Sequence, residues 1–335
     1  MPDDAMARLI DRARLVELLD RARRCHVLVI GDAMLDVYLH GDVERISPEA
    51  PVPVVRVREQ RAALGGAANV AQNVVAAGAG GTLVATVGRD AAGAALREML
   101  VRLGCADAAL IPVDRPTTRK TRLVARSQQV VRFDEEDDSE LDGSSVDAVL
   151  AGIDEAMSRA EAVVLEDYNK GMLATPVISR AIERARARNV PVVVDPKYRN
   201  FFAYRGATIF KPNRRELESA LGAAVDLDHE PSLPQVFQKL GVEHLLLTLG
   251  ERGMLLMSAA GETRRIPTTA REVYDVVGAG DTVTAYLALM LAAKATAYEA
   301  AVVANYAAGV EVGKLGAATV TPEEILEAFD GHAGA

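Results

Sequence analysis

Tryptophan is absent from this chain of 335 residues, and aromatic residues make up only 4% of it. Platforms of aromatic side chains on which nucleic-acid bases stack are therefore not expected. Cysteine is almost as rare. Cys25 and Cys105 form no C-x-x-C pair, so we expect two buried, reduced thiols. The five histidines are scattered without H-E-x-x-H or His/Cys spacing, which argues against a zinc site.

Positive charge is also in short supply, because the formal net charge is −9. This balance argues against nonspecific binding to nucleic acid or to an anionic membrane, although it leaves room for a local basic pocket. The first 24 residues are acidic and then amphipathic, so they do not resemble a signal peptide. The longest apolar run, 283–293, is too short to span a bilayer. We expect a soluble cytoplasmic protein.

Short apolar runs alternate with segments of helical periodicity, such as 90–104 and 176–189. This alternation predicts an α/β fold with a mostly parallel central sheet flanked by helices. The expected strands are 26–32, 82–88, 162–168, 190–196, 207–213 and 244–250. We see no linker and no internal repeat, and we predict a single domain over 1–335.

Two segments, about 36–60 and 117–137, break this alternation. Their runs of β-forming residues alternate apolar and charged positions, which indicates strands with one wet face. We expect a small antiparallel sheet that projects from the body and acts as a lid. Because exposed strand edges and faces tend to be covered, we expect the lid to form a homodimer contact.

The segment "VVGAGDT" places three residues with little or no side chain, Gly278, Ala279 and Gly280, directly before Asp281 and a long apolar run. Small residues let a ligand approach the backbone, and the N-terminus of the following helix attracts anions. A carboxylate beside an anion site can accept the proton of a hydroxyl that attacks a bound phosphoryl group. A simple N-terminal cap would explain Asp281 but not the small residues before it.

The same segment resembles the C-terminal signature of the ribokinase family of sugar kinases, D-T-x-G-A-G-D, with Val276 where Thr is usual. The resemblance implies a ribokinase-like fold, ATP as phosphoryl donor and Mg²⁺ held through the ATP phosphates and water. It implies that Asp281 is the catalytic base and that Gly278, Ala279 and Gly280 form the anion hole. Family members commonly hold a monovalent cation nearby, so K⁺ near 275–277 is an expectation.

Two further sets of motifs carry the resemblance. "GGAANVAQN" and "GDAMLD" resemble the family's sugar-binding segments, which implies that Asp32, Asp36, Gly65, Gly66 and Asn69 contact the sugar. "KPNRRE", "TLGERG" and "NYAAGVEVGKLGAATV" resemble its nucleotide-binding segments. Those segments imply that ATP contacts Asn213, Arg214, Arg215, Glu216, Thr248, Gly250, Gly253 and Asn305. "GVEVGKL" is not a P-loop, because it has three residues between its glycines and Leu315 where Ser or Thr is needed.

Within that family, "ISPEAPVPVV" and segments spread from Val29 to Val320 resemble the kinases of D-glycero-D-manno-heptose 7-phosphate. The resemblance implies phosphorylation of the anomeric 1-hydroxyl to the 1,7-bisphosphate, for ADP-heptose and lipopolysaccharide core synthesis. The chain stops about fifteen residues after "GAATV", so we expect the form without the fused nucleotidyltransferase domain. Candidates for contact with the substrate phosphate are Arg122, Gln128, Arg132, Lys170 and Lys197.

Other functions remain open from the sequence alone. Another kinase of the family could act on fructose 6-phosphate, ribose or a nucleoside. A dinucleotide-dependent oxidoreductase would need G-x-G-x-x-G after the first strand, and "VIGDAMLD" lacks it. A catalytically silent nucleotide-binding regulator would not need Asp281, Asn213 and Glu216 together.

Overall fold

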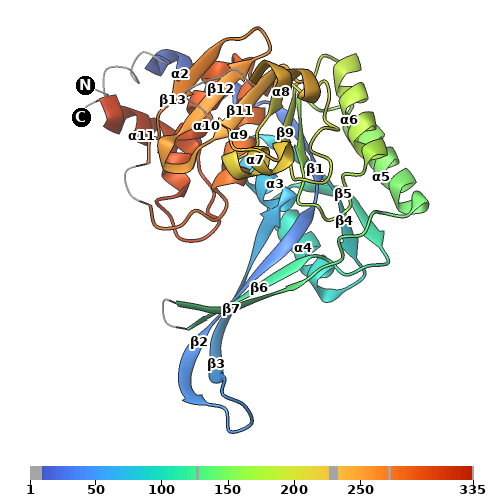
Figure 1. Ribbon diagram of the computed structural model, residues 1–335, viewed down its shortest axis with the longest axis vertical. Helices are drawn as coiled ribbons and strands as arrows, with labels where there is room; N and C mark the ends of the chain where they lie inside the picture. The colour runs from blue at the N-terminus through green and yellow to red at the C-terminus, as the bar shows by residue number, and fades with distance from the viewer. Residues whose placement is uncertain (1–9, 126–127, 226–232, 271–272, 334–335) are drawn as a thin grey trace.

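The computed structural model describes residues 10–125, 128–225, 233–270 and 273–333, and it contains two sheets (Figure 1). The larger sheet has nine strands in the order β13-β12-β11-β10-β9-β8-β1-β4-β5. All neighbouring pairs from β10–β11 to β4–β5 are parallel, whereas β12 and β13 are added antiparallel at one edge. The predicted α/β fold class is confirmed.

The strands of this sheet are β1 (His26–Gly31), β4 (Gly80–Gly88), β5 (Ala106–Val113), β8 (Ala162–Glu166), β9 (Val192–Asp195), β10 (Ile209–Phe210), β11 (His244–Thr248), β12 (Met254–Ser258) and β13 (Thr263–Ile266). β8 and β9 are buried at every residue because helices cover both faces of the sheet. The strand predicted at 207–213 is reduced to two residues, because Pro212 cannot donate to a ladder.

The helices are α2 (Arg12–Ala22), α3 (Ala67–Ala76), α4 (Ala91–Arg102), α5 (Gly143–Ala156), α6 (Thr175–Ala187), α7 (Arg214–Leu221), α8 (Leu233–Leu240), α9 (Ala279–Ala292), α10 (Ala297–Glu311) and α11 (Pro322–Ala333), with a short 3₁₀ helix at Gly250–Arg252. α3, α9 and α10 pack on one face of the large sheet, and α5 and α6 on the other (Figure 1). From Asp281 to Ala292, α9 is buried at every residue, so it is a core helix rather than an amphipathic one. None of the described helices is long and apolar enough to cross a membrane.

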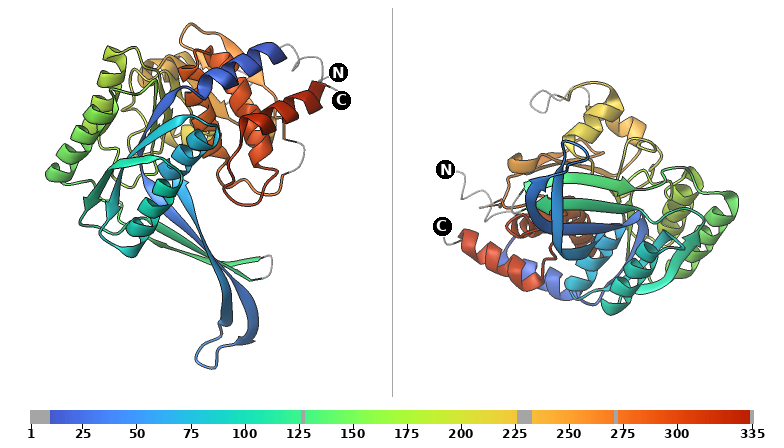
Figure 2. Two further views of the ribbon diagram at one scale, coloured as in Figure 1. Left: turned by 180° about the vertical axis from the view of Figure 1, so that it is seen from behind. Right: turned by 90° about the horizontal axis from the view of Figure 1, so that it is seen from below.

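The smaller sheet consists of β3 (Pro53–Gly66), β2 (Ala33–Ile46), β6 (Arg119–Ala125) and β7 (Gln128–Glu135), in that order. It projects from the body, as Figure 1 and the left view of Figure 2 show. The pairs β2–β3 and β6–β7 are antiparallel, as expected for the lid, but β2 and β6 are parallel. β2 follows β1 and β6 follows β5, and both of those strands end at the same edge of the large sheet. β2 and β6 therefore leave that edge in the same direction, and they pair as parallel strands.

The strand order places a reversal of direction between β1 and β8. The chain moves outward from β1 to β4 and β5, and then returns to β8 on the other side of β1. Ligands of open α/β sheets bind outside the carboxyl ends of the strands at such a reversal. The small sheet leaves the body at the same place, because β2 begins two residues after β1 ends. Both features point to this edge as the site.

Candidate active site

Asp281 lies in the first turn of α9 and is 5% exposed. Its Oδ2 accepts a hydrogen bond from Asn69 Nδ2 at 2.7 Å, and its Oδ1 accepts one from the Tyr168 hydroxyl at 2.8 Å. Burial raises the pKa of Asp281 to about 6, although these two hydrogen bonds oppose the rise. A carboxyl with this pKa is mostly ionised at pH 7 and can still accept a proton.

The loop before Asp281 requires glycine at its helix cap. Gly278 is the N-cap of α9 and has a φ of +97°, a region that side chains rarely adopt. A Cβ on Gly278 would also lie 3.1 Å from Ala317 and from Glu311 Oε1. The next residues, Ala279 and Gly280, line a large cavity. The first amides of α9 are therefore presented at a surface that a phosphoryl group can approach.

Three carboxylates gather behind this helix terminus. Glu166, Asp195 and Asp281 have oxygens within 4.8 Å of one another, and all three side chains are buried. Lys211 Nζ, also buried, pairs with Asp195 Oδ2 at 2.9 Å. Neither oxygen of Glu166 accepts a hydrogen bond from a residue that the structure describes. Burial, followed by the negative charges of Asp195 and Asp281, raises the pKa of Glu166 well above its usual value.

The sequence analysis assigned no role to Glu166, Asp195 or Lys211. Each lies at the end of a parallel strand, since Glu166 ends β8, Asp195 ends β9 and Lys211 follows β10. Carboxyl ends of parallel strands meet at one edge of the sheet, so the predicted parallel strands carried a signal that could have located these residues. Oxygen donors of this kind suit a hard cation such as Mg²⁺, and Lys211 already neutralises part of their charge.

Tyr168 was also missed, although it is the last residue of the strand expected at 162–168. Two cations contact its ring, Lys120 Nζ at 5.2 Å and Lys197 Nζ at 5.0 Å from the centroid. Lys120 comes from the small sheet and Lys197 from the loop after β9. Tyr168, which donates to Asp281, therefore contacts both the small sheet and the loop after β9.

Asp32, expected at the sugar, instead organises the loop after β8. Its carboxylate accepts hydrogen bonds from the backbone amides of Tyr168 at 2.8 Å, Lys170 at 3.0 Å and Met172 at 3.3 Å. Asp32 is 4% exposed, and burial raises its pKa. The position of Tyr168, and through it of Asp281, depends on this buried carboxylate.

The other sugar-side candidates converge where β2 and β3 leave the body. A Cβ on Gly65, which pairs with Met34 across the two strands, would come within 2.4 Å of Asp36 Oδ2, so only glycine fits at this position beside the carboxylate. Gly66 has a φ of +56° and caps α3, whose Asn69 reaches Asp281. Asp36 pairs with Arg122 at 2.5 Å, and both side chains are at most 13% exposed.

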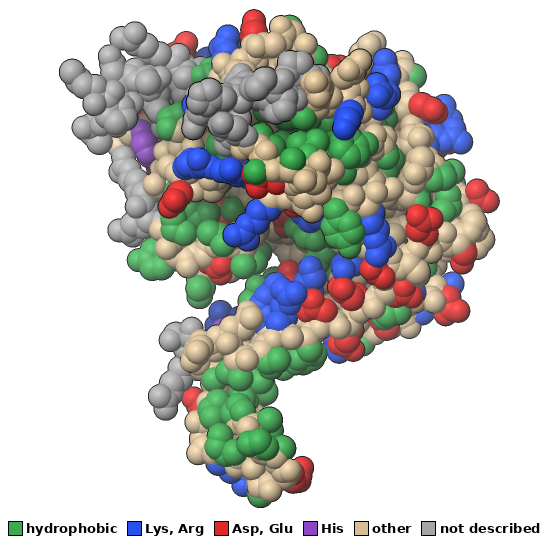
Figure 3. All heavy atoms as spheres, viewed as in Figure 1, with side chains coloured by type: hydrophobic (Ala, Val, Ile, Leu, Met, Phe, Trp, Pro, Cys, Tyr) green, Lys and Arg blue, Asp and Glu red, His purple; other side chains and the backbone are tan. Residues whose placement is uncertain are grey.

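Basic side chains gather where the small sheet meets the body, beside a hollow in the surface (Figure 3). Most of them are already paired with acids. Lys170 pairs with Glu136 at 2.8 Å, and Lys197 pairs with Glu216. Two expected residues lie farther out, since Gln128 is exposed at the start of β7 and Arg132 is half exposed and paired with Asp134.

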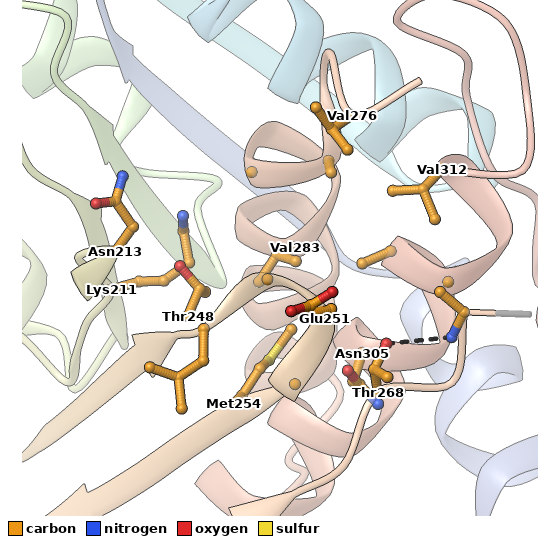
Figure 4. Close-up of a pocket in the computed structure, with 18 of the residues that line it drawn as sticks. Lys211, Asn213, Thr248, Glu251, Met254, Thr268, Val276, Val283, Asn305 and Val312 are labelled. Carbon is orange, nitrogen blue, oxygen red and sulfur yellow. Dashed lines mark hydrogen bonds between the residues drawn. The ribbon is translucent and has the colours of Figure 1, made fainter. Parts of the chain in front are cut away.

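A cavity of about 790 Å³ opens on the other side of Asp195 and Gly280. Figure 4 shows Lys211 and Asn213 on one side of it and Val276 and Val312 on the opposite side. The expected nucleotide-binding residues that line it are Asn213, Glu216, Thr248, Gly250, Gly253 and Asn305. Its size and mixed apolar and polar lining suit a nucleotide.

The remaining nucleotide candidates are turned elsewhere. Arg214 pairs with Glu218 at 2.8 Å on α7, and neither Arg214 nor Arg215 lines the cavity. Asn213 and Glu216 form a capping box at the start of α7, in which each side chain accepts a hydrogen bond from the other's backbone amide. Asn305 Nδ2 donates to the carbonyl of Pro267 at 2.8 Å, so it fixes one wall of the cavity.

The arrangement joins two binding regions at the N-terminus of α9. The basic hollow under the small sheet lies on one side of Tyr168 and Asp281, and the cavity lies on the side of Gly280 and Lys211. An acceptor hydroxyl on one side and a phosphoryl donor on the other would meet at helix amides and a buried carboxylate. Such a site can transfer a phosphoryl group.

Comparisons with known proteins agree with this geometry. The model of the pfkB family of carbohydrate kinases matches residues 25–324. The chain is 44% identical over 317 residues to the bifunctional protein HldE of Rhodospirillum rubrum, covering 94% of this chain and 64% of that protein. It is 48% identical over 303 residues to the bifunctional protein HldE of Gluconacetobacter diazotrophicus, covering 90% and 63%. The chain thus spans less than two thirds of the length of these relatives.

Solved structures show the same fold at lower identity. Arabidopsis thaliana ribokinase, complexed with ribose and ATP, has a TM-score of 0.72 at 20% identity over 91% of this chain and 98% of that chain. Escherichia coli phosphofructokinase-2, in complex with potassium, has a TM-score of 0.75 at 18% identity over 92% and 99%. The ribokinase-like fold expected from the sequence is confirmed.

The raised pKa of Asp281 predicts a pH-dependent cost to stability. Folded protein holds this proton up to a pH of about 6, whereas the unfolded chain releases it near 3.8, so stability falls as the pH rises through this window. In Asp281→Asn this fall should be smaller, by on the order of 1–3 kcal/mol. Urea unfolding at pH 4.5 and 7.5 measures it. Asp147→Asn, at an exposed position, should behave like the wild type, and an equal pH dependence in all three proteins would contradict the burial argument.

Proposed function

The chain belongs to the pfkB family of carbohydrate kinases, and from this membership we propose that it phosphorylates D-glycero-D-manno-heptose 7-phosphate at the anomeric 1-hydroxyl. ATP would be the donor, and ADP and the 1,7-bisphosphate the products. The observation that carries the proposal is the 44–48% identity to HldE proteins over at least 90% of the chain. It covers the segments that resemble the heptose phosphate kinases. The product would serve ADP-heptose and lipopolysaccharide core synthesis.

The reaction proceeds by attack of the sugar oxygen on the γ-phosphorus. Asp281 takes the hydroxyl proton as the new P–O bond forms, and the bond from the γ-phosphorus to the oxygen of ADP breaks. The amides of Gly278, Ala279 and Gly280 stabilise the charge on the transferred group. Tyr168 and Asn69 hold the Asp281 carboxylate in one orientation. Asp36, Gly65 and Gly66 position the sugar.

Magnesium ion, when bound with ATP, neutralises charge on the phosphates. Asp195 and Glu216 are the carboxylates that line the cavity near Gly280 and fit this role, directly or through water. Both are engaged with lysines, Asp195 with Lys211 and Glu216 with Lys197. These lysines are therefore placed to exchange a carboxylate partner for a phosphate when the nucleotide enters.

We propose that Lys120 binds the phosphate of the sugar substrate. The carboxylates near it are each paired with another cation: Asp36 with Arg122, Asp134 with Arg132 and Glu136 with Lys170. Within the described chain, Lys120 forms no ion pair of its own. Its ammonium group makes a cation–π contact with the Tyr168 ring. Burial lowers its pKa, so an anionic partner would stabilise its charged form.

The small sheet supports a homodimer. Its exposed apolar side chains are Val43, Ile46, Val57, Val130, Val131 and Phe133, together with Val52 between β2 and β3, and all are 36–61% exposed. Apolar side chains cover much of the projecting sheet in Figure 3. A projecting sheet with an apolar surface and two free edge strands, β3 and β7, is best covered by the same sheet of a second copy.

The remaining expectations are part of the proposal. Residues 1–335 would act as one kinase domain, with the small sheet formed by inserted segments. Cys25 and Cys105 are buried and form no disulfide, which is compatible with the reducing cytoplasm where ATP is available. A monovalent cation near Asp275 and Val277 would support the anion hole.

The central test is ADP release with magnesium-ATP and a panel of acceptors: the heptose 7-phosphate, fructose 6-phosphate, ribose and adenosine. We expect turnover on the heptose phosphate and a loss of roughly 10²–10⁴-fold in Asp281→Asn, the usual effect of removing a general base. Faster turnover on another acceptor would change the proposed substrate but would leave the assignment as a kinase intact. Near-normal turnover by Asp281→Asn would refute the role of the base.

The phosphate assignment predicts a selective binding defect. Lys120→Met should raise the KM for the phosphorylated acceptor by about 10- to 100-fold, the effect of losing a charged hydrogen bond, with little change in the KM for ATP. Arg132→Met is the matched comparison, because Arg132 is half exposed and already paired. A larger rise in KM in Arg132→Met than in Lys120→Met would place the substrate phosphate at Arg132, farther out along the small sheet. That result would overturn the assignment to Lys120.

The dimer proposal is tested by light scattering. The wild type should have the mass of two chains, and Phe133→Glu should shift it toward one, because a charge would be buried in the contact. Val101→Glu is the control, since Val101 is 57% exposed but lies on α4, outside the small sheet. A monomeric wild type would rule the proposal out.

A further inference from the structure

The turn after β11 directs an acidic side chain into the cavity. Gly250 and Gly253, at the two ends of the 3₁₀ helix, have φ angles of +61° and +77°, which produce a tight turn. Within this turn Glu251 lines the cavity, whereas Arg252 is exposed and does not line it. The chain therefore offers the cavity a carboxylate and leaves the neighbouring guanidinium outside.

The charge of Glu251 places it away from the phosphates of a bound nucleotide. Lys211 Nζ would be 3.8 Å from a Cβ on Gly280, so the phosphate end of the cavity lies at the start of α9. In Figure 4 the Glu251 side chain lies in the cavity, apart from Lys211 and Asn213. A carboxylate beside the phosphates would repel them, and the same turn could have presented Arg252 instead.

The Glu251 carboxylate is available to a ligand. It forms no hydrogen bond and no ion pair with another residue in the part of the chain that the structure describes. The two lysines that line the cavity have other carboxylate partners, since Lys211 pairs with Asp195 and Lys197 with Glu216. An acid in a cavity suited to an anion therefore calls for a neutral partner that donates hydrogen bonds.

The ribose of a nucleotide is such a partner. Its 2′- and 3′-hydroxyls lie on neighbouring carbons, and each can donate a hydrogen bond. A carboxylate has two oxygens that only accept, so one side chain can bind both hydroxyls at once. In dinucleotide-binding folds an acidic side chain recognises the ribose 2′-hydroxyl in this way. Apolar walls such as Met254 and Val312 remain for the base.

We propose that Glu251 accepts hydrogen bonds from the 2′- and 3′-hydroxyls of the donor nucleotide and so selects ribonucleotides over 2′-deoxyribonucleotides. The inference rests on the nucleotide-binding role of the cavity in the proposed function, and it adds the residue that recognises the sugar of the donor. A 2′-deoxynucleotide would leave one carboxylate oxygen without its hydrogen bond. A site built to hydrogen-bond a hydroxyl discriminates strongly against the ligand that lacks it.

Nucleotide binding without an acceptor sugar tests the inference. Isothermal titration calorimetry of the wild type with magnesium and ADP, 2′-deoxy-ADP or 3′-deoxy-ADP gives three dissociation constants. We expect ADP to bind about 10- to 100-fold more tightly than either deoxynucleotide, the effect of losing one charged hydrogen bond. In a second readout, kcat/KM of the wild type should favour ATP over 2′-deoxy-ATP.

Glu251→Ala should remove this preference, so that its dissociation constants for ADP and 2′-deoxy-ADP become nearly equal. Loss of one negative charge changes the attraction of both nucleotides alike, and the ratio of the two constants therefore isolates the contact with ribose. Glu251→Gln keeps one acceptor oxygen and should show an intermediate ratio. Arg252→Ala is the matched control, because it removes a charge from the same turn outside the cavity and should keep the wild-type ratio.

The same ratio in the wild type and in Glu251→Ala would overturn the inference, as would a wild type that binds ADP and 2′-deoxy-ADP equally. Either result would leave the kinase reaction intact, because the two nucleotides carry the same phosphates. A wild type that binds no ADP would instead refute the cavity as the nucleotide site, and with it both proposals.

Discussion

The structure depends on one carboxylate held by two hydrogen bonds from distant parts of the chain. Asp281 is bound by Asn69, 212 residues away, and by Tyr168, 113 residues away. These three residues come from α3, the loop after β8 and α9, which meet only when the parallel sheet has formed. Because Asp32 holds the loop of Tyr168 through three backbone amides, four separate segments fix the geometry of one side chain. The rigid body thereby positions a group that a flexible loop could not hold with the same accuracy.

The buried carboxylates of this site lower the stability of the fold. Glu166, Asp195 and Asp281 lie close together in the protein interior, and Lys211 is the only buried cation among the described residues that pairs with one of them. Burial and like charges raise the pKa of Asp281 to about 6 and raise the pKa of Glu166 well above its usual value, so these carboxyls are harder to ionise in the folded protein than in the unfolded chain. The same burial and charge repulsion keep the pKa of Asp281 high enough for its carboxylate to accept a proton. Strain of this electrostatic kind is expected where a site is selected for reactivity rather than stability.

The sequence predicted the body of the fold well because its strands are short apolar runs that end at glycine or polar residues. It also predicted the projecting sheet, whose segments lack helical periodicity, but not the parallel pairing of β2 and β6, which follows from how the chain leaves β1 and β5. Asn69 and Asp281 were found because each lies in a glycine-rich motif with fixed spacing. Tyr168, Asp195 and Lys211 were missed because each is a single polar residue after a strand, and only the strand order brings them together. Asp32 was found as a site residue but serves the loop after β8, a role that no local pattern could indicate.

The arrangement of cations shows how an acidic protein can bring two anionic substrates together. Tyr168 contacts both Lys120 on the small sheet and Lys197 beside the cavity, and its hydroxyl donates to Asp281. A phosphorylated acceptor under the small sheet would engage one lysine, and the phosphates of a nucleotide in the cavity would engage the other. Each anion would then compensate the charge of its own lysine, so that the two substrates need not share a cation. These two lysines and the positive end of α9 would limit the repulsion between the anions, while the reacting oxygen and phosphorus still meet at Asp281.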